Sequence, residues 1–119
     1  MDAFENKRRH PRAPTRCMIR YRDPAERDVR KSELSTARDL SEGGVRFTSG
    51  KKFEVGDIID LEISCPNFPD PVHAQGEIQW NRELRKGFLY ENGVQFLDLS
   101  PEGQETIHEI IALILKKSS

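Results

Sequence analysis

The sequence predicts a mainly β protein, in which about six short antiparallel strands are followed by one amphipathic helix. Two observations predict this fold class. Apolar residues alternate with polar ones in short segments that recur roughly every ten residues between residues 16 and 99. After residue 99 the apolar spacing changes to that of a helix. Strands arranged in this way form a small antiparallel barrel or a sandwich.

The first half of the chain supplies an arm and three of the expected strands. We expect an extended, flexible arm over residues 1–15, because Pro11 and Pro14 disfavour helix. Segments of strand composition follow at 16–23, 32–40 and 45–49. A charged turn or loop at 23–31 separates the first two, and the tight connection SEGG (41–44) precedes the third.

The second half supplies three more strands, which are expected at 58–64, 72–80 and 88–99. A stretch with two glycines (50–57) comes before them. The segment CPNFPDP (65–71) contains three prolines and is expected to be a loop, and 81–87 is expected to be a turn. Gly76 lies inside a strand and is typical of a β-bulge.

The last element is a helix over 100–117. Ser100 suits the N-cap and Pro101 the first helical position. Lys116 and Lys117 lie near its C-terminal end, where the helix dipole favours cations. The apolar face consists of Ile107, Ile110, Ile111, Ile114 and Leu115. We expect this face to close one end or side of the barrel; a partner surface is the alternative.

Length and composition point to one globular domain. The chain has 119 residues, of which 35% are hydrophobic and 33% charged, which fits a folded, water-soluble protein. It has no apolar run of the roughly 20 residues that a membrane helix needs, and no apolar stretch typical of a secretory signal. We therefore expect a cytoplasmic protein without membrane insertion, in which Cys17 and Cys65 are reduced.

Positive charge is concentrated at one end of the chain. The first 22 residues contain seven basic and two acidic side chains and so carry +5. Because the net charge is −1, the remainder carries −6. A general nucleic-acid binder usually has a basic face over its whole fold. The local cluster suits a small polyanion better.

Sequence patterns for catalysis and metal binding are missing. The histidines and cysteines show no metal-ligand spacing. There is no Gly-x-Ser-x-Gly elbow, no cysteine in an activating context and no phosphate-binding P-loop. We therefore expect no enzyme activity, no catalytic residue, no metal and no cofactor.

Two short segments carry the residues of a candidate binding site. In KRRHPR (7–12), Arg8 and Arg12 are four residues apart, and guanidinium groups bind phosphates or the edge of guanine and stack on purines. In DLSEGG (39–44), Asp39 can accept from guanine or orient an arginine, and Ser41 can bind a phosphate or the backbone. Gly43 and Gly44 permit positive φ and a close approach. Read singly, these segments are a solvated basic tail and an ordinary tight turn.

Together, the two segments resemble the PilZ domain family. Their order and spacing, the six-strand pattern, the terminal helix and the segment YENGVQF (90–96) carry the resemblance, which covers about residues 7–117. It implies a six-stranded antiparallel barrel over 16–119, with a C-terminal helix and a flexible N-terminal arm. It also implies a bacterial receptor that binds the second messenger cyclic di-GMP.

The resemblance assigns roles to individual residues. Arg8 and Arg12 would grip guanine edges and phosphates from the arm, which folds over the ligand. Asp39 and Ser41 would contact a guanine or a phosphate, and Gly44 would leave room for it. Further candidates for ligand contact are Lys7, Arg9, Gly43 and Trp80. For Trp80 the alternative is a residue of the barrel core or rim.

Three functional hypotheses follow. In the first, the domain is a cyclic di-GMP effector, monomeric or homodimeric, whose arm becomes ordered on binding and signals to an unidentified protein partner. In the second, it is a ligand-independent interaction barrel of a motility or surface-organelle apparatus. In the third, it is a barrel that binds single-stranded nucleic acid; the acidic barrel region and the lack of an aromatic, basic groove argue against it.

Overall fold

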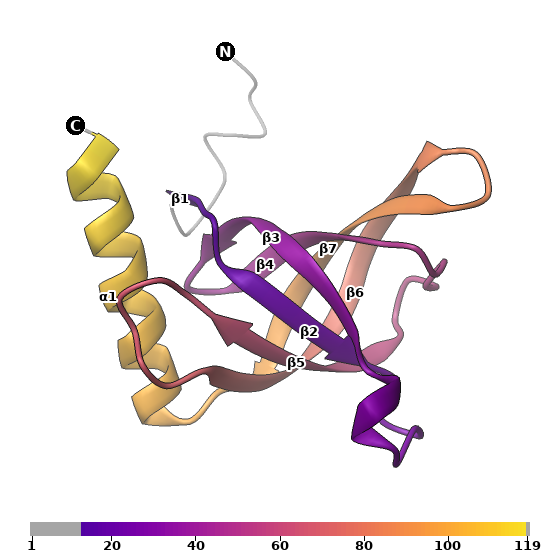
Figure 1. The fold of residues 1–119 in the computed structure, drawn as a ribbon, viewed down its shortest axis with the longest axis horizontal. Coiled ribbons are helices and arrows are strands. Elements are labelled where there is room, and N and C mark those ends of the chain that lie inside the picture. Colours follow the sequence, from indigo (N-terminus) through magenta and orange to yellow (C-terminus); the bar gives the residue numbers. More distant parts are fainter. Residues whose placement is uncertain (1–12, 119) are drawn as a thin grey trace.

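Six antiparallel strands form the body of the molecule, as Figure 1 shows for the computed structural model, which describes residues 13–118. Their bounds are β2 (Met18–Arg22), β3 (Glu33–Ser41), β4 (Gly44–Ser49), β5 (Ile58–Ser64), β6 (Val72–Arg85) and β7 (Leu89–Asp98). A two-residue strand β1 (Ala13–Pro14), a 3₁₀ turn η2 (Val29–Lys31) and the helix α1 (Pro101–Ser118) complete the described chain.

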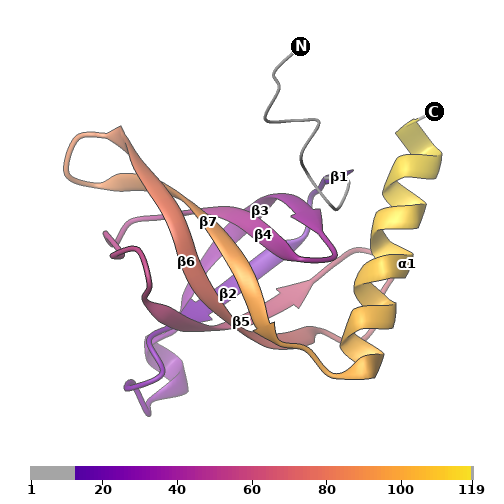
Figure 2. The same ribbon diagram turned by 180° about the vertical axis from the view of Figure 1, so that it is seen from behind.

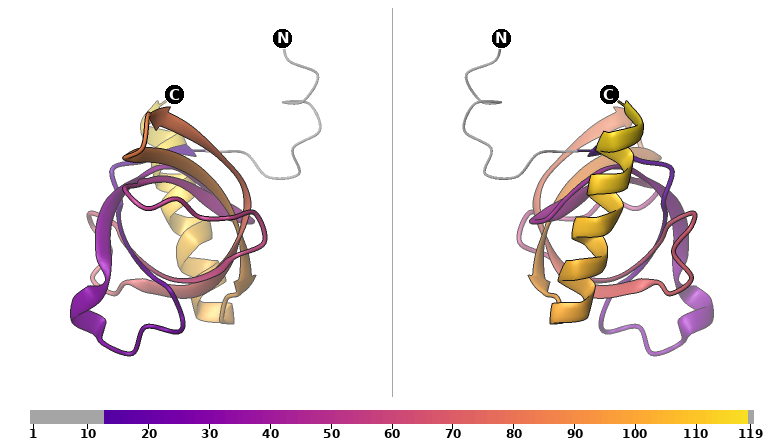
Figure 3. Two further views of the ribbon diagram at one scale, coloured as in Figure 1. Left: turned by 90° about the vertical axis from the view of Figure 1, so that its right-hand side faces the viewer. Right: turned by 90° about the vertical axis from the view of Figure 1, so that its left-hand side faces the viewer.

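The sheet closes on itself and so forms a barrel. The strand order is β1-β3-β2-β5-β6-β7-β4, and an additional pairing of β4 with β3 joins the two ends. Figure 3 shows the resulting ring, with α1 lying across one of its mouths. The predicted fold of a six-stranded antiparallel barrel with one C-terminal helix is confirmed. Closure removes the free edges that β4 and β3 would otherwise expose.

Alternating side chains fill the barrel interior. On β5, for example, Ile59, Leu61 and Ile63 are buried while the residues between them are partly exposed. The same period of two places the side chains of the other strands inside or outside. The aromatic members of the core are Tyr21, Phe47 and Phe53, whose rings stack at tilted and edge-on angles.

Helix α1 closes one end of this core, as predicted. Ser100 caps it, because its Oγ accepts a hydrogen bond from the amide of Gly103 at 3.0 Å. Ile107, Ile110 and Ile111 are buried in the same cluster as the strand residues. These three residues of the predicted apolar face are therefore part of the core, Ile114 packs against it partly buried, and Leu115 is 39% exposed. No helix in the described part of the chain is long and apolar enough to span a membrane.

The β6–β7 hairpin is longer than expected. Residues 81–87 were predicted to be a turn, but β6 continues to Arg85 and pairs with β7 as far as Leu89. This end of the hairpin projects on the side away from α1 (Figures 1 and 2). The prediction failed because residues 82–88 are exposed on both faces and so lack apolar alternation. The expected irregularity at Gly76 is confirmed by a register shift between Gln75 and Gly76.

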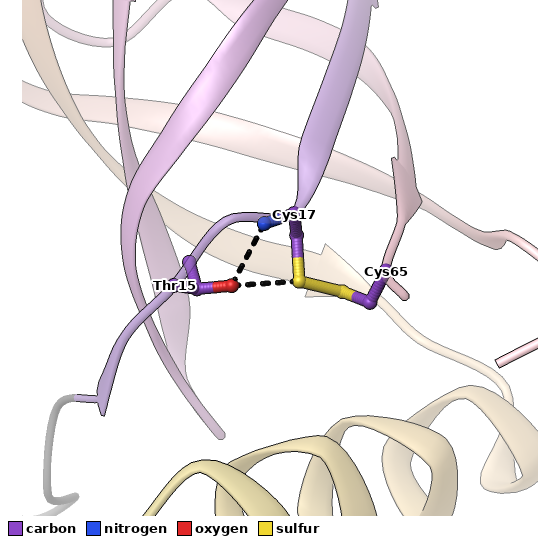
Figure 4. The surroundings of a disulfide bond; sticks show 3 residues. All are labelled: Thr15, Cys17 and Cys65. Atoms are coloured by element: carbon purple, nitrogen blue, oxygen red, sulfur yellow. Dashed lines mark hydrogen bonds between the residues drawn. A yellow bond between two sulfur atoms is a disulfide. The ribbon is translucent and has the colours of Figure 1, made fainter. Parts of the chain in front are cut away.

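The two cysteines form a disulfide instead of remaining reduced. Met18 of β2 pairs with Ser64 of β5, so Cys17 and Cys65 lie next to each other just beyond this pair, with a Cα–Cα distance of 4.2 Å. The hydroxyl of Thr15 donates to the Cys17 sulfur and accepts from the Cys17 amide, as Figure 4 shows. The bond ties the start of β2 to the end of β5.

Candidate functional site

The β3–β4 hairpin carries the Asp-x-Ser-x-x-Gly segment. Asp39 and Ser41 end β3, and Gly44 begins β4 opposite Ser41. The Ser41 hydroxyl accepts hydrogen bonds from the amides of Gly43 and Gly44, at 3.3 and 3.2 Å. Ser41 therefore holds the turn, in the manner of serines that bond the backbone a few residues ahead. The Ser41 side chain is buried, and these hydrogen bonds stabilise the β3–β4 turn.

Gly44 is required by packing within the barrel. A Cβ at this position would lie 2.0 Å from the carbonyl oxygen of Val94 on β7. The sequence predicted that Gly43 and Gly44 permit positive φ and close approach to a ligand. Among the described glycines, however, positive φ is found at Gly56 and Gly87. The group that comes close to Gly44 is thus the backbone of β7.

Asp39 is paired with an arginine that the sequence analysis did not single out. Asp39 lies opposite Arg46 in the β3–β4 register, and the Arg46 Nη2 is 2.7 Å from the Asp39 Oδ2. The sequence left two uses open for Asp39: accepting from a guanine, or orienting an arginine. Within the barrel its carboxylate pairs with the guanidinium of Arg46. The sequence holds only an indirect sign of this pairing: Arg46 is two residues after Gly44 and so lies on the same face of β4 as the glycine of the motif.

A buried carboxylate extends this pairing to β7 and β6. Glu91 is 1% exposed. Its Oε2 lies 3.9 Å from the Arg46 Nε, and its Oε1 accepts a hydrogen bond from the Arg82 Nε at 3.0 Å. Asp39, Arg46, Glu91 and Arg82 therefore form a series of alternating charges across four neighbouring strands, which we call the ion-pair series.

Trp80 lies on the same outer face of the barrel. It pairs with Gly93 of β7, and Gly93 in turn pairs with Arg46 of β4. A Cβ on Gly93 would lie 2.1 Å from the Trp80 Nε1, so the indole covers the bare backbone of this glycine. Trp80 is 37% exposed. It is therefore a surface residue next to the ion-pair series, and the alternative of a core position does not apply.

The predicted arm residues Lys7, Arg8, Arg9 and Arg12 lie outside the described residues. The first described strand, β1, lies beside the Asp-x-Ser-x-x-Gly segment. In β1, Ala13 pairs with Leu40 and Pro14 pairs with Asp39 of β3. The chain therefore enters the barrel directly beside the strand that carries Asp39 and Ser41.

Two surface hollows of the described part of the chain lie away from these residues. One of about 620 Å³ is lined by residues of β2, the β2–β3 loop, the start of β3 and the β4–β5 loop, among them Tyr21 and Phe53. Another of about 550 Å³ lies between α1 and the disulfide. Neither includes Asp39, Ser41, Gly44 or Trp80. Within residues 13–118, no group of three or more His, Cys, Asp or Glu side chains could hold a metal ion.

Comparison with known protein families identifies the family of this chain. The profile of the PilZ domain matches residues 6–113, and so includes the arm, the β3–β4 hairpin and Trp80. The chain belongs to the PilZ domain family. PilZ domains are a family of cyclic di-GMP-binding proteins and are not enzymes, so membership supports the expectation of a non-catalytic protein.

Solved PilZ structures share the fold of this domain at low sequence identity. The PilZ domain of YcgR from Escherichia coli with c-di-GMP gives a TM-score of 0.69 at 16% identity, with 94% of each chain covered. The complex of K. pneumonia MrkH with c-di-GMP gives 0.75 at 16% identity, and Bacillus subtilis MotI gives 0.73 at 11%. Both matches cover 94% of this chain.

This PilZ domain spans about half the length of several of these proteins. It covers 54% of the MrkH chain and 51% of the MotI chain. The shared part is thus the barrel with its helix. A search of curated protein sequences gave no significant match.

Proposed function

We propose that this PilZ domain is a cyclic di-GMP receptor whose site lies between the N-terminal arm and the outer face of β3, β4, β7 and β6. One observation carries the proposal. Because β1 pairs with β3 at Leu40 and Asp39, the arm leaves the barrel beside the Asp-x-Ser-x-x-Gly segment. This supports a site to which both halves of the sequence motif would contribute.

The arm is long enough to cover this face. Arg8 is five residues before Ala13, and an extended chain of five residues spans up to roughly 17 Å. Neighbouring strands are about 4.8 Å apart, so the three steps from β1 across β3 and β4 to β7, where the Trp80 indole covers Gly93, span about 14 Å. Arg8 and Arg12, with Lys7 and Arg9 as further contacts, would therefore meet phosphates and guanine edges above Asp39 and Trp80.

The positive charge of the arm would drive the change between its free and ligand-bound states. Four cations within residues 7–12 repel one another when no ligand is bound. Cyclic di-GMP carries two negative charges, and its binding would neutralise the arm and order it against the barrel. An unidentified protein partner would then recognise the ordered arm or the surface that it leaves.

Titration calorimetry with cyclic di-GMP tests this function. The expected result is a saturable heat for the wild type, from which the stoichiometry also follows, and loss of binding in Arg8→Ala and in Arg12→Ala. Arg20→Ala is the matched control, because Arg20 is exposed on β2 and hydrogen-bonds to Ser32 at 3.1 Å, outside the site. No heat with the wild type, or unchanged affinity in both arm variants, would overturn the proposal.

The end of the β6–β7 hairpin favours a second candidate function, that of a ligand-independent interaction barrel. Phe88 is 62% exposed and Leu84 is 39% exposed, and both lie where the hairpin projects from the barrel. If these two side chains belong to one contiguous apolar patch, that patch would be a surface for protein contacts. This function would be supported by a wild type that gives no heat with cyclic di-GMP.

A further inference from the structure

We infer that Arg46 and Glu91 are positioning residues of the cyclic di-GMP site: Glu91 fixes Arg46, and Arg46 fixes the carboxylate of Asp39 for the ligand. This inference rests on the proposed function and deepens it. It adds to the motif two residues whose spacing in the sequence gives no direct sign of the role.

The first step is the state of Asp39. Its side chain is 9% exposed, and a carboxylate so largely removed from water needs a compensating charge. Arg46 supplies this charge at 2.7 Å from the neighbouring strand. A charge-assisted contact of this length restricts the orientation of both groups.

The second step is the state of Arg46. Its Nε is buried and has no hydrogen-bond partner, but it lies 3.9 Å from the Oε2 of Glu91. The guanidinium is therefore placed between two carboxylates, one on β3 and one on β7. Trp80 covers Gly93, the residue that pairs with Arg46 on β7.

The third step separates a positioning role from a contact role. The Glu91 side chain is 2% exposed, so a ligand on the outer face cannot touch it. Any effect of Glu91 on ligand affinity must therefore pass through the two arginines that it contacts. Arg82 is 64% exposed and lies on β6, whereas Arg46 contacts Asp39 directly, so we assign the effect of Glu91 to Arg46.

Calorimetry with cyclic di-GMP tests the inference in four variants: Arg46→Ala, Glu91→Gln, their double mutant and Arg22→Ala. We expect roughly a tenfold loss of affinity in each of the first two. The double mutant should bind no more weakly than Arg46→Ala, because Glu91 acts through Arg46. Arg22→Ala is the matched control: Arg22 pairs with Asp60 at 3.3 Å, and its side chain is 27% exposed, compared with 33% for Arg46.

A second readout needs no ligand. The ¹³C NMR signal of the Asp39 carboxyl carbon should shift in Arg46→Ala and in Glu91→Gln, but not in Arg22→Ala. Thermal unfolding of each variant shows whether it is folded at the temperature of the titration, and Arg46→Lys replaces Arg46→Ala if the latter is not. Lysine keeps the charge but cannot reach both carboxylates with one planar fork, so its affinity should also fall.

The outcomes distinguish the two claims. If the wild type binds cyclic di-GMP and Glu91→Gln binds equally well, the positioning role is wrong and the proposed function stands. Additive losses in the double mutant, or an unchanged Asp39 signal, would also overturn it. If the wild type does not bind, the proposed function fails, whatever the NMR signal of Asp39 shows.

Discussion

The indole of Trp80 lies over the backbone of Gly93, the residue that pairs with Arg46 of β4. Gly93→Ala would place a Cβ 2.1 Å from the Trp80 Nε1, so the indole must turn away. We expect a red-shifted emission from this single tryptophan and a stability loss of about 1–3 kcal/mol, as in other overpacked sites. Fluorescence and urea unfolding measure both, and an unchanged emission maximum would contradict the contact.

Gly44 should tolerate no side chain, because the atom that a Cβ would meet belongs to the backbone. The Val94 carbonyl oxygen would be 2.0 Å away, so β4 and β7 would have to separate. Gly44→Ala should therefore cost about 2 kcal/mol or more in the free energy of unfolding. Gly50→Ala is the control, since its Cβ would have its nearest contact at 3.7 Å. Equal stability of the two variants would argue against this strand spacing.

The disulfide should make stability depend on reductant. It joins residues 48 apart in sequence, and a loop of this length corresponds to about 4 kcal/mol in the chain-entropy estimate. We expect Cys65→Ser to lower the free energy of unfolding by roughly 2–4 kcal/mol. Urea unfolding with and without a reducing agent provides the measurement. A Cys17→Ser/Cys65→Ser double variant is the control, and its stability should not respond to reductant.

Binding of cyclic di-GMP should weaken with salt, because the proposed contact is between a cationic arm and a dianion. Raising sodium chloride from about 50 mM to about 500 mM shortens the Debye length from roughly 14 to 4 Å. We expect roughly a 3- to 10-fold increase in Kd by calorimetry. Lys7→Ala should show a weaker salt dependence than the wild type. A Kd that does not change with salt would mean that arm charge contributes little.

The strands with an apolar side could be predicted from the sequence, whereas features that depend on register could not. Alternation located β5 because its inward residues are aliphatic. The outer half of β6 was missed, since Arg82–Arg85 is exposed on both sides and is a strand only through its pairing with β7. The disulfide was missed for a related reason: it depends on the pairing of Met18 with Ser64.

The candidate site shows the same division. Asp39, Ser41 and Gly44 could be found because their spacing forms a motif. Arg46 and Glu91 have no motif of their own, and charged residues in strands are usually solvated. Their relation to Asp39 arises from the neighbouring positions of β3, β4 and β7, which only the closed barrel defines.

The hollow between α1 and the disulfide brings both ends of the described chain to one corner of the molecule. Pro14 and Thr15 line it from one side, and Ile110 and Ile114 of the helix from the other. A donor fluorophore attached to the arm and an acceptor attached to the last turn of α1 would therefore start within energy-transfer range. A change in the energy-transfer efficiency of this labelled pair would then report a movement of the arm relative to α1.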